Sequence, residues 1–188
     1  MSIFQRGLQE HLELFQDLSP LSAPIGEAAA LICGALRSGG KLMLCGNGGS
    51  AADSQHIAAE MAGRFVNDRR PLAAVALSTD TSTMTCIAND YTFDEVFSRQ
   101  VMGLGARGDC LLAISTSGNS RNVIRAAEAA RTAGVHVIGL LGKGGGALRT
   151  ICDVPIVVPS QVTARIQEAH IFIGHTLCAL VEEALGLA

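Results

Sequence analysis

The chain has 188 residues, of which 48% are hydrophobic and 16% charged, and its formal net charge is −3. This length and composition are typical of one domain with a substantial core. The small negative charge argues against nucleic acid as a partner. We find neither a cleavable leader at the N-terminus nor an apolar run of membrane-spanning length, so we expect a cytoplasmic protein that does not associate with membranes.

Residues 1–38 carry two helical patterns. Apolar side chains recur at helical spacing from Leu8 to Phe15, and after the turn signal Ser19-Pro20 an Ala-rich pattern runs from Ile25 to Leu36. These patterns predict two amphipathic helices ahead of the first strand.

Beyond residue 40, short apolar runs alternate with helical patterns. The expected strands are Lys41–Cys45, Ala73–Leu77, Cys110–Ile114, Val135–Leu141 and Pro155–Val158, and the expected helices are Ala51–Phe65, Asn119–Ala133 and about 162–185. Such alternation predicts an α/β fold whose parallel sheet is covered by helices on both faces. No linker interrupts the pattern, so we predict a single domain over residues 1–188.

Six cysteines are spread widely along the chain, without a Cys-x-x-Cys pair. Their surroundings are mostly apolar. This pattern favours reduced core thiols of a cytoplasmic protein over disulfides or metal ligands.

Two Gly-containing loops each follow an expected strand and precede an expected helix. The first, Cys45–Ser50, fits the loose Gly-x-Gly-x-x-Ala pattern of dinucleotide folds, but no acidic residue is well placed after it and no Gly-Lys-Ser/Thr ending is present. In the second, the hydroxyls of Ser115, Thr116, Ser117 and Ser120 surround Gly118. A helix cap would need fewer hydroxyls, so the second loop predicts a phosphate site at a helix N-terminus.

Polar side chains recur at helical spacing on two of the expected helices. His56 and Glu60 are four residues apart, and Gln167 and His175 are eight apart, so each pair shares one helix face. Such residues can bind a metal ion or pair a base with an orienting imidazole, whereas the alternative is the polar face of a surface helix. Asp53 is a candidate partner for the His56 ring. We interpret His11, His136, Glu168 and His170 as structural.

Four motifs resemble the phosphoheptose isomerase branch of the sugar isomerase (SIS) domain superfamily. They are Cys-Gly-Asn-Gly-Gly-Ser-Ala-Ala-Asp-Ser-Gln-His-Ile-Ala-Ala-Glu (45–60), Ala-Asn-Asp-Tyr (88–91), Ile-Ser-Thr-Ser-Gly-Asn-Ser (114–120) and Thr-Ala-Arg-Ile-Gln-Glu-Ala-His-Ile (163–171). The similarity runs from about residue 20 to the C-terminus. It implies a flavodoxin-like three-layer sandwich with a five-stranded parallel sheet. It also implies a homotetramer with shared active sites, to which the N-terminal helices contribute.

The resemblance further implies a reaction and roles for the matching residues. The reaction is conversion of sedoheptulose 7-phosphate to D-glycero-D-manno-heptose 7-phosphate, the first step toward nucleotide-activated heptose such as the ADP-heptose of lipopolysaccharide. The implied phosphate contacts are Ser115, Thr116, Ser117 and Ser120, and the implied sugar contacts are Asn47, Gly48, Gly49, Ser50, Asn89, Asp90 and Gln167. Zinc would be bound by His56, Glu60, Gln167 and His175. Some members carry an acidic residue where this chain has Ala164.

For the chemistry, we hypothesise that Glu60 moves a proton between C1 and C2 through an enediol while His175 serves the oxygen atoms. A Glu60 bound to zinc would be a poorer base, which leaves open whether the metal releases it or only organises the site. The alternative function is a non-catalytic SIS tetramer that binds a replication-initiator protein; in such relatives the equivalents of Glu60 and His175 are replaced. A sugar-phosphate-sensing regulatory domain is disfavoured because no effector segment is attached.

Overall fold

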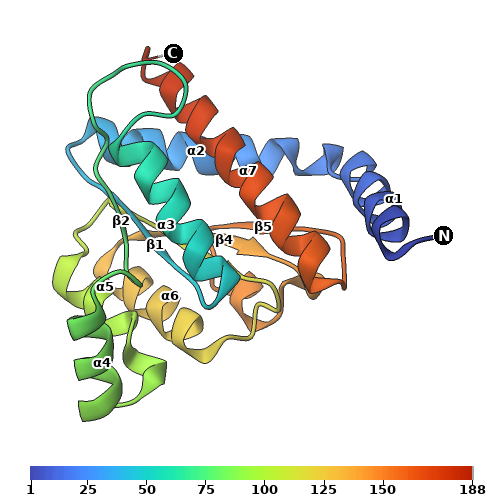
Figure 1. The fold of residues 1–188 in the computed structure, drawn as a ribbon. Coiled ribbons are helices and arrows are strands. Elements are labelled where there is room, and N and C mark those ends of the chain that lie inside the picture. The colour runs from blue at the N-terminus through green and yellow to red at the C-terminus, as the bar shows by residue number, and fades with distance from the viewer. Residues whose placement is uncertain (188) are drawn as a thin grey trace.

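The protein is described by a computed structural model over residues 1–187. Its centre is a five-stranded, all-parallel sheet in the order β2-β1-β3-β4-β5 (Figure 1). The strands are β1 Leu42–Cys45, β2 Ala74–Ala76, β3 Cys110–Ser115, β4 His136–Leu141 and β5 Val154–Val157. Leu42 of β1 lies opposite Ala74 on one side and Cys110 on the other. The prediction of an α/β fold with a five-stranded parallel sheet is confirmed.

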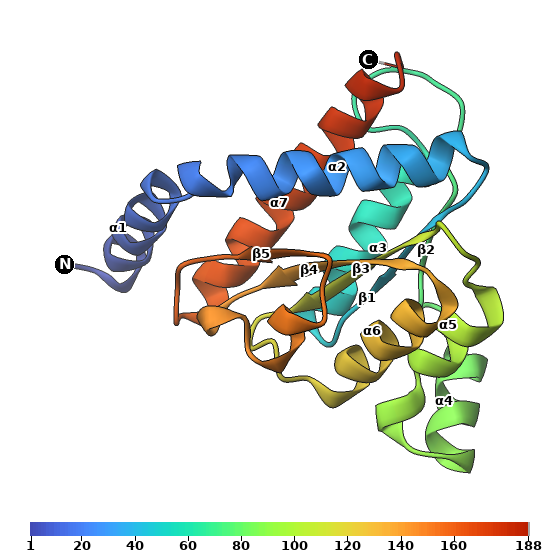
Figure 2. The same cartoon turned by 180° about the vertical axis from the view of Figure 1, so that it is seen from behind.

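Within residues 1–187, seven α-helices complete the fold, and with the sheet they form three layers (Figures 1 and 2). They are α1 Ile3–Gln16, α2 Ser22–Arg37, α3 Gly49–Ala62, α4 Thr81–Asp90, α5 Ser98–Leu104, α6 Arg121–Ala133 and α7 Thr163–Ala184. Short 3₁₀ turns lie at Ser19–Leu21, Phe93–Glu95, Lys143–Gly145 and Ala147–Thr150. Helices α2, α3 and α7 pack on one face of the sheet, and α4, α5 and α6 on the other.

Side chains of the strands alternate between the two helical layers. Leu42 and Leu44 of β1 belong to the core under α2, α3 and α7, whereas Met43 and Cys45 belong to the core under α5 and α6. Because both faces are covered, each strand must be apolar on both sides, which is why the strands appear in the sequence as continuous apolar runs.

Helix α1 extends away from the rest of the molecule (Figure 2). Its residues Ile3, Phe4, Leu8 and Leu12 are exposed. By length and composition alone, the stretch Ser19–Arg37 that follows could cross a membrane. In the folded protein, however, one side of α2 is buried against the sheet and α7, as expected of a core helix in a globular protein.

All six cysteines are free thiols in the structure. Burial raises the pKa of Cys45, Cys110, Cys152 and Cys178 to about 12, so these thiols stay protonated and unreactive near neutral pH. Cys86, on α4, is the exposed one.

Candidate active site

The two Gly-containing loops lie together at the carboxyl edge of the sheet, where neighbouring strands β1 and β3 end. A reciprocal pair of amide hydrogen bonds joins them: Asn47 Nδ2 donates to Asn122 Oδ1 at 2.9 Å, and Asn122 Nδ2 donates to Asn47 Oδ1 at 2.8 Å. Asn122 is almost fully buried. The pair therefore fixes the N-terminus of α3 relative to that of α6, as ligand sites at this edge of parallel sheets require.

The loop before α3 depends on two glycines. Gly48 has a φ of 54°, a conformation that strongly favours glycine, and it begins the helix without a side-chain cap. At Gly49 a Cβ atom would approach the side-chain nitrogen of Gln167 to 2.2 Å, so the Gln167 side chain lies directly against this glycine. The structure thus brings Gln167 of the fourth motif against the first motif.

The loop before α6 is organised by its own hydroxyls. The Ser115 and Ser120 hydroxyls are 3.0 Å apart, and Ser115 also accepts from the Gly118 N–H at 3.1 Å. Ser117 accepts from the Asn119 N–H. Ser120 does not cap α6 with its side chain, so in the described chain the N–H groups of Arg121 and Asn122 are uncapped, whereas that of Val123 donates to Asn122 Oδ1. Uncapped N–H groups, hydroxyl donors and the helix dipole together make an anion site here.

His56, Glu60 and His175 converge where α3 and α7 pack side by side, running in the same direction away from the loops (Figure 1). The Nε2 atoms of His56 and His175 are 2.9 Å apart, and Glu60 Oε1 is 3.4 Å from His56 Nε2. Close contact between the helices requires Gly174, since a Cβ there would approach Ile57 Cδ1 to 2.5 Å. We call this line of contact the α3–α7 seam.

The two imidazoles share one hydrogen bond, so one ring donates while the other presents a bare nitrogen lone pair. The side chain of His56 is 48% exposed and that of Glu60 26%, so the group opens toward solvent. On the inner side the Phe65 ring packs against His175, with ring centroids 5.6 Å apart. The arrangement can hold a base, a proton donor and an orienting ring within one cluster of neighbouring side chains.

Asp53 lies one turn before His56 on α3. Burial raises its pKa above the ordinary range, and the nearby His56 ring offsets part of that effect. Its Oδ2 atom is buried without a hydrogen-bond partner among the described residues. The charge of the His56 ring therefore influences the pKa of Asp53, although no hydrogen bond joins the two side chains.

The three side chains of the seam have the chemistry of a zinc site but not its spacing. Two ligands of a tetrahedral zinc stand about 3.3 Å apart at ordinary bond lengths, whereas the two imidazole nitrogens are in direct hydrogen bond at 2.9 Å. Within residues 1–187, no group of three or more His, Cys, Asp or Glu side chains is arranged to hold a metal ion. Gln167, the fourth expected ligand, packs against Gly49, about two helical turns from His56.

Asn89 and Asp90 lie at the exposed end of α4. In the described chain their hydrogen bonds stay within that helix: Asn89 Nδ2 donates to Asp90 Oδ1 at 2.8 Å, and the Cys86 thiol donates to Asp90. Ala164 lies in the first turn of α7. A single chain thus joins the two loops and the α3–α7 seam, but leaves the Asn89–Asp90 pair apart from them.

Sequence reasoning missed several residues of the site. Asn122, Phe65 and Arg69 contact predicted site residues or their backbone, and Glu182 contacts Phe65 and Arg69. Asn122 could have been suspected from its place just after the hydroxyl-rich loop, where a buried amide can reach the neighbouring loop. The others reach the site through contacts distant in sequence, which spacing alone does not reveal.

Comparison with known proteins places these features in a family. The model of the SIS domain matches residues 8–142. The phosphoheptose isomerase of Rhodospirillum rubrum is 55% identical over 177 residues, which cover 94% of each chain, and that of Nitratiruptor sp. is 54% identical over 96% of this chain and 97% of its own.

Solved structures agree with the sequence comparison. The phosphoheptose isomerase GmhA from Neisseria gonorrhoeae superposes with a TM-score of 0.91 at 47% identity, covering 96% of this chain and 97% of that one. A phosphoheptose isomerase from Francisella tularensis gives a TM-score of 0.87 at 38% identity, covering 96% of this chain and 94% of its own. The chain therefore belongs to the phosphoheptose isomerase family of SIS-domain sugar-phosphate isomerases.

Proposed function

We propose that the protein converts sedoheptulose 7-phosphate to D-glycero-D-manno-heptose 7-phosphate by proton transfer through an enediol. The observation that carries the proposal is the contact of His56 with Glu60 and His175 on the α3–α7 seam. This cluster lies about two helical turns along α3 from Gly49, in the loop that the Asn47–Asn122 bonds join to the start of α6, next to the hydroxyl-rich loop. In this substrate the reacting carbons C1 and C2 lie at the opposite end of the chain from the phosphate on C7. The separation between anion site and acid–base group suits such a molecule.

In the proposed mechanism the phosphate lies against the hydroxyls of Ser115, Thr116, Ser117 and Ser120 and the uncapped start of α6. Asn47, Gly48, Gly49, Ser50 and Gln167 line the neighbouring loop and would contact the sugar. Glu60 takes the proton from C1 and returns it to C2, while His175 exchanges protons with the carbonyl and hydroxyl oxygens. His56, hydrogen-bonded to His175, orients that ring.

We further propose one Zn²⁺ per subunit, held by His56, Glu60 and His175, with Gln167 as the fourth ligand. The donor set supports this assignment, since two imidazoles and a carboxylate are typical catalytic zinc ligands. The imidazoles would have to separate by about 0.4 Å to reach tetrahedral spacing, and Gln167 would have to turn away from Gly49. When bound, the ion would polarise the substrate carbonyl as a Lewis acid. Glu60 and His175 would carry protons only while the ion has released them; otherwise the ion would serve mainly to organise the site.

A homotetramer with shared active sites forms part of the proposal. The exposed apolar side of α1 supports it, and so does a cavity of about 480 Å³ lined mainly by apolar residues of the α1–α2 region and α7, including Phe15, Ile25 and Phe172. Both are surfaces that a second copy of the chain would cover. Assembly would also offer Asn89 and Asp90 a route to the site of a neighbouring subunit.

The proposed setting is the cytoplasm, at the first step toward nucleotide-activated heptose such as ADP-heptose for lipopolysaccharide. Free thiols at all six cysteines suit a reducing compartment.

The test is incubation of purified, metal-defined protein with sedoheptulose 7-phosphate, with and without added zinc, followed by product analysis. Wild-type protein should form the aldoheptose phosphate, and zinc should raise the rate. Glu60→Gln and His175→Ala should each lower kcat at least about 100-fold, because each removes a proton carrier.

The matched control is His136→Ala, which removes an exposed histidine at the start of β4. This is the amino end of the strand, whereas the loops of the site follow the carboxyl ends. It should keep wild-type activity. Near-normal activity in the Glu60 or His175 variant would contradict the assigned roles. No product from wild-type protein under either metal condition would favour the alternative, a binding scaffold for a replication-initiator protein.

A further inference from the structure

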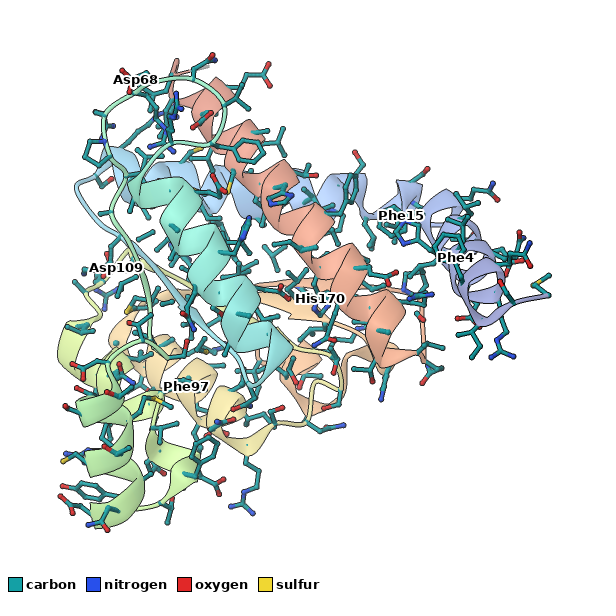
Figure 3. The ribbon with its side chains drawn as sticks, viewed as in Figure 1. Phe4, Phe15, Asp68, Phe97, Asp109 and His170 are labelled. Carbon is teal, nitrogen blue, oxygen red and sulfur yellow. The ribbon has the colours of Figure 1, made fainter. Side chains whose placement is uncertain are left out.

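A buried ion pair lies on the α3–α7 seam beyond the proposed proton carriers. Arg69 Nε donates to Glu182 Oε1 at 2.6 Å, and the two side chains are only 1% and 2% exposed. Glu182 is on α7, about two turns after His175. Arg69 belongs to the segment between α3 and β2, which arches over the ends of both helices near the labelled Asp68 (Figure 3).

Arg69 holds the end of α3. Its Nη2 donates to the carbonyl oxygen of Glu60 at 2.7 Å, and its Nη1 to those of Met61 at 2.9 Å and Gly63 at 3.0 Å. The last carbonyl groups of a helix have no partner within it, and a cation is favoured at that end of the dipole. The planar guanidinium satisfies several of them in a fixed geometry, and one of its bonds reaches the backbone of Glu60 itself.

Glu182 joins Arg69 to the residues around His175. The Oε1 atom that receives Arg69 also accepts from the Phe65 N–H at 3.1 Å, and the Phe65 ring packs on His175. Burial alone would raise the pKa of Glu182, but the hydrogen bonds from Arg69 and Phe65 outweigh it and hold that pKa below its ordinary range. The charged pair thus connects the backbone of Glu60 to the ring that supports His175.

We infer that Arg69 and Glu182 are positioning residues of the isomerase, whose ion pair sets the spacing between Glu60 on α3 and His175 on α7. The inference rests on the proposed function of those two residues. A buried ion pair is an inefficient source of stability, because apolar side chains of similar size avoid its desolvation cost. It does fix geometry, however, and proton transfer loses rate steeply when the groups are displaced.

The experiment compares Glu182→Gln with the matched control Asp109→Asn. The Asp109 side chain is also only 2% exposed, and its carboxylate accepts from Lys41 Nζ at 2.5 Å. It accepts from backbone N–H groups as well. It lies at the start of β3, away from the seam (Figure 3). Each substitution keeps the shape of the side chain and removes its charge, so both should destabilise the fold.

Measured per folded molecule, Glu182→Gln should lower kcat about tenfold or more with little change in KM. Asp109→Asn should keep kcat within about twofold of wild type. Arg69→Lys keeps the positive charge but lacks the planar guanidinium, so its kcat should also be below that of wild type. The double variant Arg69→Met/Glu182→Met should fold, because apolar replacement of a buried pair is tolerated, and should still have low kcat.

The inference is overturned if Arg69→Lys or the double variant has wild-type kcat, or if the kcat losses of Glu182→Gln and Asp109→Asn are equal. A second measurement separates it from the proposed function. If wild-type protein fails to isomerise the sugar, NMR signals of the His56 and His175 rings still report the geometry. These signals should shift in Glu182→Gln and stay in place in Asp109→Asn; unchanged signals in both would overturn the inference.

Discussion

His170 is a buried histidine held neutral by its surroundings. It is a fully buried residue of α7 (Figure 3), and its Nε2 donates to the carbonyl oxygen of Leu141 at 3.1 Å while its Nδ1 has no partner among the described residues. Burial lowers its pKa from 6.5 to about 4, and the bond to Leu141 offsets only a little of that effect. Its burial and its hydrogen bond to Leu141, the last residue of β4, suit the structural interpretation.

We therefore predict an acid-sensitive fold. Between pH 6.5 and about 4 the unfolded chain binds a proton at this position and the folded chain does not, so the free energy of unfolding falls as the pH falls through that window. The full loss is on the order of 3 kcal/mol. Denaturant unfolding of wild type and His170→Gln at several pH values measures it; an equally steep decline in the variant would contradict the assignment.

The sequence predicted the polar side chains of the seam better than the residues that hold them in place. Helical spacing placed His56 and Glu60 on one face, and the structure brings both to His175. Their catalytic roles remain predictions. Spacing could not reveal that Arg69 and Glu182 would meet, because that pairing depends on how two helices and a long connection pack.

Among the elements, those with strong apolar patterns were predicted and those with polar ones were not. The five strands lie within or close to the expected ranges, although β2 is only Ala74–Ala76. Helices α4 and α5 were not anticipated. Helix α4 contains three Thr residues and buries only Ile87, and α5 is short, so neither carries a clear periodicity. They become helical through packing, α5 against α6 and α4 against the Phe93–Glu95 turn, and α4 also has the Asp80 cap.

The loop between β3 and α6 has no room for a Cβ atom at Gly118. Gly118 has a φ of 65°, and a Cβ there would approach the Gly145 carbonyl oxygen to 1.8 Å. Gly118→Ala should therefore push the loop from the neighbouring Gly142–Gly146 segment and destabilise the fold by at least about 1 kcal/mol. KM for the sugar phosphate should rise more than kcat falls, as steady-state kinetics would show.

Gly34→Ala is the matched control for that substitution. Gly34 lies inside α2 with open space around it, so alanine should raise the free energy of unfolding by up to about 1 kcal/mol and leave KM unchanged. An unaltered KM in Gly118→Ala would contradict the phosphate role of the loop.

For the whole molecule, the sequence indicated the parallel sheet, but the order β2-β1-β3-β4-β5 depends on how successive crossovers pack. The projecting helix α1 is likewise hard to predict, because its apolar face finds no partner within the described chain apart from its contacts with α7. Its purpose in the proposed tetramer is to supply that face to another subunit.

Phe4→Asp should break this assembly. Phe4 is 77% exposed, so a charge there leaves the folded subunit intact but is costly to bury in an interface. Light scattering after gel filtration should show a smaller species than wild type, with low activity. Gln9→Asp adds the same charge to the same helix off its apolar side, and should keep the wild-type mass. An unchanged mass for Phe4→Asp would exclude α1 from the interface.

The distribution of cysteines gives the wild-type chain a natural attachment point for a spectroscopic label. Cys86 is exposed, whereas the other five are buried or half-buried with raised pKa values. Its own pKa is raised by the hydrogen bond to Asp90, so attachment is best done at alkaline pH. A spin label or fluorophore on Cys86 would lie one helical turn from Asp90 and report, without engineering, whether the end of α4 approaches a neighbouring subunit.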